Sequence, residues 1–225
     1  MARIGKRARI GLMLLAVCVA AIAVTCVLVG TGRLCITSAA RPENRSSFDL
    51  PAYTSSNDQD GDGVDDQPDI LAAALAYVET KPRYKSAYYA SGYPDDGYRV
   101  CTDVVAVACR EAGYDLQELV HEDIAASPET YDVDQPDSAI DFRRVRNLRV
   151  FFERNAQTLT CDPARIGEWQ GGDIVVFENH IGIVSDRRNA SGVPYLIHHA
   201  SQFQLAYEED ALERYAPVVG HFRLG

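Results

Sequence analysis

The hydrophobic pattern of this chain changes its period near residue 158. Before that point, apolar residues recur at helical spacing and predict helices at about 68–78, 101–112, 115–126 and 147–155. After it the alternation has period two, and turn residues separate five segments typical of strands, namely "GGDIVVFE", "HIGIVSD", "PYLIHHA", "FQLAYEE" and "VVGHFRL". Helices followed by an antiparallel meander predict an α+β domain with the N-terminal helices packed on the sheet.

An uncharged apolar segment near the N-terminus is the second constraint. Residues 10–31 form a run of 22 residues without charge, and a helix of this length spans roughly 33 Å, enough to cross a bilayer core of about 30 Å. Four basic residues precede the run and none comparable follows. This asymmetry predicts a single-pass anchor in the cell membrane, with a cytoplasmic N-terminus and an extracytoplasmic domain.

A cleaved signal peptide is the alternative for the same segment. The small residues of "TSAA" at 37–40 offer a possible cleavage site. However, the apolar run is longer than the usual signal core of about 7–15 residues, and "TSAA" lies well past its end. The pattern therefore favours an uncleaved anchor.

The charge balance argues against nucleic-acid binding. The formal net charge is −10, and residues 33–225 hold 18 basic and 32 acidic residues, a net of −14. Nucleic-acid binding requires a basic surface, so no nucleic-acid partner is expected.

Six aspartates gather in "NDQDGDGVDDQPDI", just before the first predicted helix of the domain. Counted from Asp58, the spacing matches a twelve-residue calcium loop, with Gly63 at the sharp turn of position 6. The loop departs from an EF-hand, because position 12 is Asp rather than a bidentate Glu and position 8 is the charged Asp65. A single loop of this kind predicts a structural Ca²⁺ brace; a solvated acidic turn is the alternative. The predicted ligands are Asp58, Asp60, Asp62, Val64 (through its carbonyl), Asp66 and Asp69.

Two cysteines fall on the helix predicted at 101–112. Cys101 lies at its start, where the helix dipole and free backbone N–H groups lower a thiol pKa, whereas Cys109 lies among small apolar residues typical of a core. Eight residues apart on one helix, the two lie about 12 Å apart, too far for a disulfide. A bridge from either to Cys161 or Cys35 remains open. Cys101 is thus the candidate nucleophile.

The histidines supply partners for such a nucleophile. His180 opens a predicted strand and shares a face with Gly182, whose small size leaves room for a substrate or a helix end. His198 and His199 are adjacent on the next strand, so only one of them can share the face of His180. The same opposition disfavours a zinc site built from all three. His221 is expected to be structural or at the surface, on the polar side of the last strand.

These segments resemble two related groups of proteins. "VCTDVVAVA" followed by "GDIVVFENHIGIVSD" is similar to the NlpC-type papain-like cell-wall peptidases. More closely, residues 67–224 resemble the bacterial domain-of-unknown-function 1287 family in "GYRVCTDVV", "LVHEDI", "IDFRRVRNL", "GDIVVFENHIGIVSDRR" and "IHH". The resemblance implies a papain-like α+β fold and no cofactor for catalysis.

The resemblance also implies roles for individual residues. Cys101 matches the nucleophile, His180 the general base, and His198 the third group that orients the base. The peptidase motif "Asp-Cys-Ser-Gly" is here "Val-Cys-Thr-Asp", so Asp103 stands two residues beyond the thiol. A carboxylate there opposes a thiolate unless it pairs with a base such as Arg143 or Arg144. A substrate-binding role is a further prediction for Asp103, Arg143 and Arg144.

Together these features predict a membrane-anchored, extracytoplasmic cysteine hydrolase of amide bonds that acts on cell-wall (peptidoglycan) peptides. The alternatives are an inactive wall-binding module braced by calcium and a thiol acyltransferase on the same fold. The predicted parts are a basic tip and transmembrane anchor at 1–32, a polar tether at 33–56, the calcium loop at 57–69 and the papain-like domain at 70–225.

Overall fold

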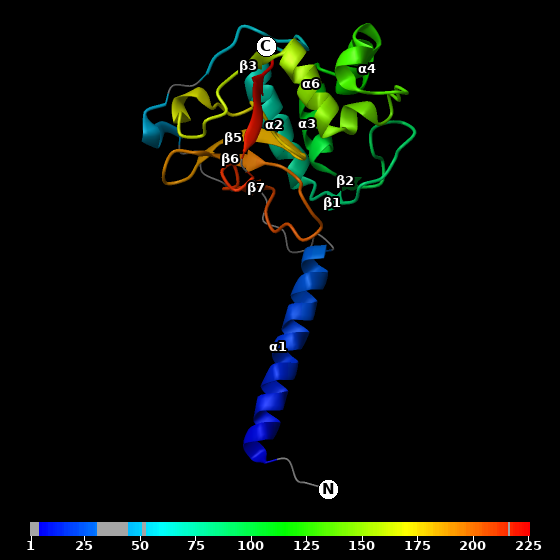
Figure 1. Ribbon diagram of the computed structural model, residues 1–225. Helices are drawn as coiled ribbons and strands as arrows, with labels where there is room; N and C mark the ends of the chain where they lie inside the picture. Colours follow the sequence, from blue (N-terminus) through cyan, green and yellow to red (C-terminus); the bar gives the residue numbers. More distant parts are fainter. Residues whose placement is uncertain (1–4, 31–44, 51–52, 216) are drawn as a thin grey trace.

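The computed structural model describes residues 5–30, 45–50, 53–215 and 217–225 (Figure 1). Most of the predicted tether, including Cys35 and the "TSAA" segment, lies outside these residues. The described helices are α1 (Lys6–Gly30), α2 (Asp66–Glu79), α3 (Cys101–Glu111), α4 (Leu116–Ala126), α5 (Pro128–Tyr131) and α6 (Val145–Asn155), with 3-10 turns η1 (Arg45–Phe48), η2 (Asp141–Arg143) and η3 (Ile166–Glu168).

The four helices predicted for the domain are confirmed as α2, α3, α4 and α6, with ends that shift by at most two residues. α2 starts two residues before Pro68, so the proline still lies in the first turn, where its missing N–H costs nothing. α4 is capped by the Asp115 carboxylate, which accepts a hydrogen bond from the backbone N–H of Gln117. The short α5 follows Ser127 and was not predicted.

Helix α1 is long and apolar enough to cross a membrane over Lys6–Leu28. Its side chains from Lys6 to Val27 are exposed to solvent, and none of the charged residues of the chain falls between Ile10 and Gly30. The segment is thus compatible with a single-pass anchor and also with a signal peptide.

The domain is α+β, with a six-stranded antiparallel sheet. Its strands are β3 (Gln157–Thr158), β4 (Ile174–Phe177), β5 (His180–Arg188), β6 (Pro194–Ile197), β7 (Glu208–Glu209) and β8 (Val218–Arg223), and they lie in the order β3-β8-β4-β5-β6-β7. A separate parallel pair joins β1 (Arg83–Tyr84) to β2 (Tyr98–Arg99).

The prediction of a simple meander is wrong at its last strand. β4 to β7 do form a meander, but β8 returns across the sheet and pairs with β4 on the side away from β5. β4 is buried along its whole length, so both of its edges need hydrogen-bond partners, and β8 supplies the second edge. The buried carboxylate of Asp173 draws β8 to this position, because it binds both His221 and Arg223.

The sheet separates two apolar layers. Ile174, Val176, Ile181 and Ile183 face the main core, where α2 and α3 pack against β5, while Val175 and Val184 face a smaller cluster around Trp169. Figure 1 shows α2 and α3 alongside the sheet. Side chains of β5 therefore alternate between the helices and the opposite face, and this alternation fixes which residues of the strand meet α3.

Candidate active site

Cys101 is the first residue of α3, as predicted. The preceding Val100 is extended, and its backbone N–H donates to the Asp103 carboxylate at 2.8 Å, which closes the first turn of the helix. Cys101 is half-buried, and the backbone N–H groups of Ile181 and Thr102 lie close enough to its sulfur to lower the thiol pKa, in opposition to burial. The proximity of Ile181 places the sulfur beside the residue that follows His180.

His180 and His198 meet across two neighbouring strands. Nε2 of His180 lies 2.8 Å from Nδ1 of His198, with the rings at 82° to one another. His198 therefore shares the face of His180, and His199 lies on the other face, edge-on to Tyr84 and Tyr207. Because His198 and His199 point apart, the three histidines do not converge on one metal position.

Gly182 was predicted to leave room beside His180 for a substrate or a helix end. In the structure it instead allows His198 to reach His180. A side chain there would meet Leu196 at 2.7 Å, the carbonyl of Ile197 at 2.8 Å and Cβ of His198 at 3.1 Å. The space beside His180 is thus filled by β6 itself rather than by a substrate or a helix end. The missing Cβ lets β6 approach closely enough to bring His198 against His180.

A second group of side chains, which the sequence did not single out, surrounds the far end of His198. Nε2 of His198 lies 3.2 Å from the Gln204 amide nitrogen and 3.7 Å from the Glu209 carboxylate, which also pairs with Arg214. Tyr215 stacks on the His180 ring with centroids 4.8 Å apart. These residues come from the loop and strand after "IHH", where no motif marks them; the acidic pair of β7 is the one hint in the sequence.

The contacts of His198 decide the tautomer of His180. When His198 donates its Nε2–H toward Glu209, its Nδ1 accepts from Nε2–H of His180, and Nδ1 of His180 is left as a free base for the thiol. When the Gln204 amide instead donates to His198, both rings reverse and Nδ1 of His180 carries the proton. Glu209 thus favours the tautomer in which Nδ1 of His180 is free to take a proton, and Gln204 favours the tautomer in which Nδ1 already carries one.

Both members of the Cys101–His180 pair rest in their neutral forms. Burial raises the pKa of the Cys101 thiol to about 11, against the opposing hydrogen bonds from the backbone N–H groups. Burial, together with the neighbouring His198 and His199, lowers the pKa of His180 to about 3. Cys101 is therefore a thiol and His180 a neutral imidazole at neutral pH, rather than a thiolate and an imidazolium.

Asp103 and Arg143 form a buried ion pair at the base of α3. The guanidinium donates to both carboxylate oxygens, at 2.7 and 3.1 Å, and a third bond runs from Arg143 to the carbonyl of Ala87. Arg144 instead pairs with Asp141 at 3.1 Å and is partly exposed. The pairing explains how a carboxylate is tolerated two residues from the thiol, and the substrate-binding role of Asp103, Arg143 and Arg144 stays a prediction.

Three of the predicted calcium ligands bring their carboxylate oxygens close together, and Asp66 does not point toward them. Oxygens of Asp58, Asp60 and Asp62 lie within 4.8 Å of one another, and positive φ angles at Gly61 and Gly63 form the turn. The Asp66 carboxylate is turned inward, where it accepts from the Gln59 N–H at 2.8 Å and from the Tyr114 hydroxyl.

Asp69 lies close enough to this aspartate group for the charges to interact. Burial and the charges of Asp62, Asp60 and Asp58 raise the pKa of Asp69. In the opposite direction, hydrogen bonds from the loop backbone, led by that of Gly63, lower the pKa of Asp58. No contact of the Val64 carbonyl distinguishes it as a ligand. Calcium binding stays a prediction for all six residues.

His221 is buried, not at the surface. Its ring lies parallel to that of Trp169 at 3.8 Å between centroids, and its Nε2 lies 2.9 Å from the Asp173 carboxylate, which Arg223 also binds. Asp173, the last residue of the "GGD" segment, therefore links β8 to the start of β4 through its side chain. Cys101, Cys109 and Cys161 are free thiols in the structure.

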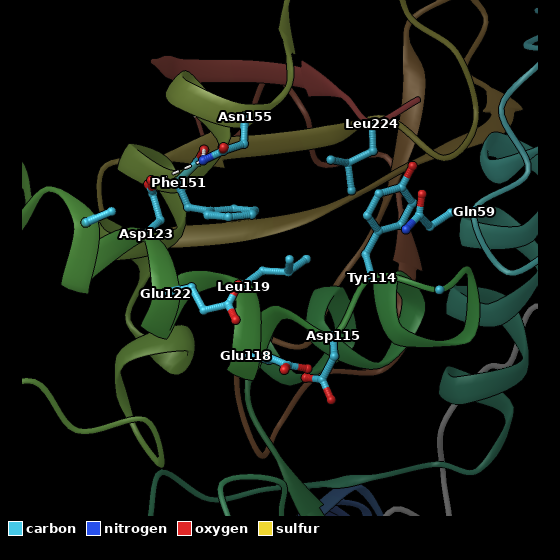
Figure 2. Close-up of a pocket in the computed structure, with 12 residues that line it drawn as sticks. Gln59, Tyr114, Asp115, Glu118, Leu119, Glu122, Asp123, Phe151, Asn155 and Leu224 are labelled. Carbon is cyan, nitrogen blue, oxygen red and sulfur yellow. Dashed lines mark hydrogen bonds between the residues drawn. The ribbon is translucent and has the colours of Figure 1, made fainter.

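A pocket of about 540 Å³ lies away from these residues, between α4, α6 and the C-terminus. Figure 2 shows Tyr114, Leu119, Phe151 and Leu224 directed into it, with Glu118 and Glu122 at its edge. None of Cys101, His180 and His198 lines it. This pocket is therefore separate from the candidate catalytic residues.

Comparison with known proteins identifies a protein family and a curated relative that match most of the domain. The sequence profile of the family described as "Domain of unknown function (DUF1287)" matches residues 71–224. The "Uncharacterized protein YijF" of Escherichia coli (strain K12) is 38% identical over 151 residues, which cover 63% of this chain and 72% of that protein. No solved structure matches the chain significantly.

Proposed function

Because this chain belongs to the DUF1287 family, whose name assigns no activity, we propose from its own geometry that it is a cysteine hydrolase of amide bonds. The observation that carries the proposal is the His180–His198 contact, next to Ile181, whose backbone N–H lies near the Cys101 sulfur. The Cys101 sulfur lies at the N-terminus of α3 against the N–H of Ile181, and the adjacent His180 is held by His198 at 2.8 Å. A thiol, a base and an orienting group in this order are the requirements for nucleophilic catalysis.

In the proposed reaction Nδ1 of His180 takes the thiol proton as the sulfur bonds to the carbonyl carbon of the substrate. The C–N bond then breaks, and His180 returns the proton to the leaving amine, which leaves a thioester on Cys101. Water attacks the thioester, giving its proton to His180, and the thiol is restored with release of the carboxylic acid. Since both groups begin neutral, proton transfer and attack are coupled, rather than starting from a stored thiolate.

The oxyanion that forms during attack needs hydrogen-bond donors within about 3 Å. The backbone N–H groups at the start of α3 are the nearest candidates, because the first N–H groups of a helix have no partner within the helix. The N–H of Thr102 lies close enough to the Cys101 sulfur to lower the thiol pKa. Rotation of the sulfur toward a carbonyl carbon would free this N–H for the oxyanion.

Cell-wall peptides are the proposed substrate. The helix α1 would act as a single-pass anchor with a cytoplasmic N-terminus, which holds the domain outside the membrane, where wall peptides are the abundant amides. A papain-like ancestry is consistent with the packing of α3, which begins at Cys101, against β5, which begins at His180. A Ca²⁺ ion held by the Asp58 loop would brace the start of α2; the ion takes no part in the proposed chemistry.

An inactive wall-binding module is the second candidate, and one observation favours it. A thiol whose pKa is raised to about 11 is a weak nucleophile at neutral pH unless a base removes its proton during attack. The hydrolase requires His180 to remove the proton of the Cys101 thiol, whereas the binding module does not.

The experiment uses the full chain in detergent, purified wall peptides and mass spectrometry of the products. Loss of cleavage in both Cys101→Ala and His180→Ala, with Cys109→Ala retaining activity as the matched control, would support the hydrolase. Absence of cleavage by the unmodified protein on any wall peptide, with binding retained, would favour the binding module. Addition of an amine acceptor, with products assigned as amides or acids, separates a hydrolase from an acyltransferase.

A further inference from the structure

The segment that leads into α3 has a charge opposite to that of the rest of the domain. Residues 81–100 hold four basic and two acidic residues, a net of +2, within a region whose net charge is −14. They also hold five of the twelve tyrosines of the chain. A cationic, aromatic segment in an acidic domain indicates a local surface suited to an anionic group.

This segment lies directly beside the nucleophile. β1 pairs with β2 in parallel, with Tyr84 in register with Arg99, two residues before Cys101. Paired residues of neighbouring strands project to the same side. The Tyr84 ring lies edge-on to His199 at 5.4 Å, and its hydroxyl is close enough to Cys101 for their charges to interact. The side of the strand pair that carries Tyr84 and Arg99 therefore faces His199 and Cys101.

Arg99 is a cation without a counter-ion. Its guanidinium is half-buried, donates to the carbonyl of Tyr98 at 2.8 Å, and forms no ion pair with a carboxylate in the part of the chain that the structure describes. Arg83, on the opposite side of the pair, stacks on the Tyr98 ring at 4.7 Å and is exposed. A guanidinium is costly to hold away from water without an anion, and its donors match a carboxylate.

Two buried polar atoms on side chains around Tyr84 and Arg99 have no hydrogen-bond partner among the described residues. They are Nδ1 of His199, beside Tyr84, and the Tyr77 hydroxyl, within reach of the Arg99 charge, on side chains that are 1% and 8% exposed. The Arg99 charge acts on the Tyr77 hydroxyl, and the Tyr207 ring lies 5.0 Å from His199. Buried polar groups normally have partners, so a polar ligand or water is expected to complete this region.

We infer that Arg99, with Tyr84 beside it, binds a free carboxylate of the substrate next to the scissile amide. The inference deepens the proposed function, on which it rests, by naming the substrate class: peptides that carry a carboxylate adjacent to the reacting bond, rather than neutral or amidated peptides. Bidentate binding by Arg99 would fix the carbonyl of the scissile bond relative to the Cys101 sulfur.

The test measures binding separately from cleavage. The full chain carrying Cys101→Ala, in detergent, is titrated calorimetrically with two synthetic wall peptides of the same sequence, one with free carboxylates and one with carboxamides. The free-carboxylate peptide is expected to bind at least about tenfold more tightly, as for a hydrogen bond to a charged group. Adding Arg99→Gln should remove this preference, Arg99→Lys should retain part of it, and Arg83→Gln, the matched control on the opposite side, should keep it.

Equal affinity for the two peptides, no binding of either, or a preference that survives Arg99→Gln would overturn the inference. Circular dichroism and melting temperatures of each variant check that the domain is folded. Cleavage by the unmodified protein is measured in parallel on both peptides. A preference that depends on Arg99 without any cleavage would support the carboxylate site and overturn the hydrolase, so the two proposals fail separately.

Discussion

His180 and His198 face each other at 2.8 Å across β5 and β6, and the outer nitrogen of His198 lies 3.7 Å from Glu209. This line of groups leads from His180 to a carboxylate on β7, and it is held by Arg214 and by the stacking of Tyr215 on His180. The orientation and tautomer of the proposed base therefore depend on residues more than twenty positions away in the chain. The predictions below test this line and its surroundings.

Glu209→Gln is expected to lower kcat by about tenfold or more with little change in KM, because His198 loses the acceptor that favours the productive tautomer of His180. Glu209 is a positioning residue in this scheme, and such partners typically contribute 10–100-fold. Glu213→Gln, an exposed carboxylate in the same segment, is the matched control. Gln204→Leu should leave the rate unchanged or raise it; a loss equal to that of Glu209→Gln would contradict the tautomer assignment.

Stability is expected to fall as the pH drops from 6.5 toward 4. The folded state holds His180 neutral with a pKa of about 3, whereas the unfolded chain binds a proton near pH 6.5, so protons favour unfolding in this window. At pH 5 this histidine alone costs about 2 kcal/mol relative to pH 8. Urea unfolding at the two pH values, compared with His180→Asn, measures the share of His180. An identical pH dependence in the variant would contradict it.

For a hydrolase with this pair of groups, kcat/KM is expected to stay constant between about pH 5 and 9. The lowered pKa of His180 moves the acidic limb well below the usual histidine range, and the raised pKa of Cys101, about 11, moves any basic limb above pH 9. The measurement is kcat/KM against pH. A bell-shaped profile centred near pH 6 would indicate a thiolate–imidazolium pair instead.

Arg143→Met is expected to destabilise the domain by about 3–5 kcal/mol, because it leaves the Asp103 carboxylate buried and unpaired. Arg149→Met, which removes the exposed partner of Glu153, should cost under about 1 kcal/mol. Chemical unfolding of both variants compares them. A small loss for Arg143→Met together with a large loss of substrate affinity would instead support the predicted substrate-binding role.

Removal of calcium is expected to lower the melting temperature of the full chain. An ion present at 100 times its dissociation constant stabilises the folded state by about 2.7 kcal/mol. Asp58→Asn should reduce the effect of a chelator, because this carboxylate faces Asp60 and Asp62 in the loop. A melting temperature that a chelator leaves unchanged would reject the brace.

Much of the site could be predicted because its geometry is local. The place of Cys101 at the start of α3 follows from the helical pattern. Strand alternation left either His198 or His199 to share the face of His180, and the family resemblance pointed to His198, which lies against His180 in the structure. The ionic partner of Asp103 was harder to predict, because its candidates Arg143 and Arg144 are adjacent in the sequence. The backbone of η2 directs Arg143 toward Asp103 and leaves Arg144 to pair with Asp141.

The sequence by itself determined the kind and order of the elements, the apolar N-terminal helix, and the helix end and strand faces that carry Cys101, His180 and His198. These follow from periodicity and from end signals that act over a few residues. Only the tertiary structure decided that β8 pairs with β4, that Glu209 and Gln204 compete for His198, and that Arg99 has no counter-ion among the residues that the structure describes. Those relationships join residues far apart in the chain, and burial and long-range packing select them with no local pattern to mark the partners.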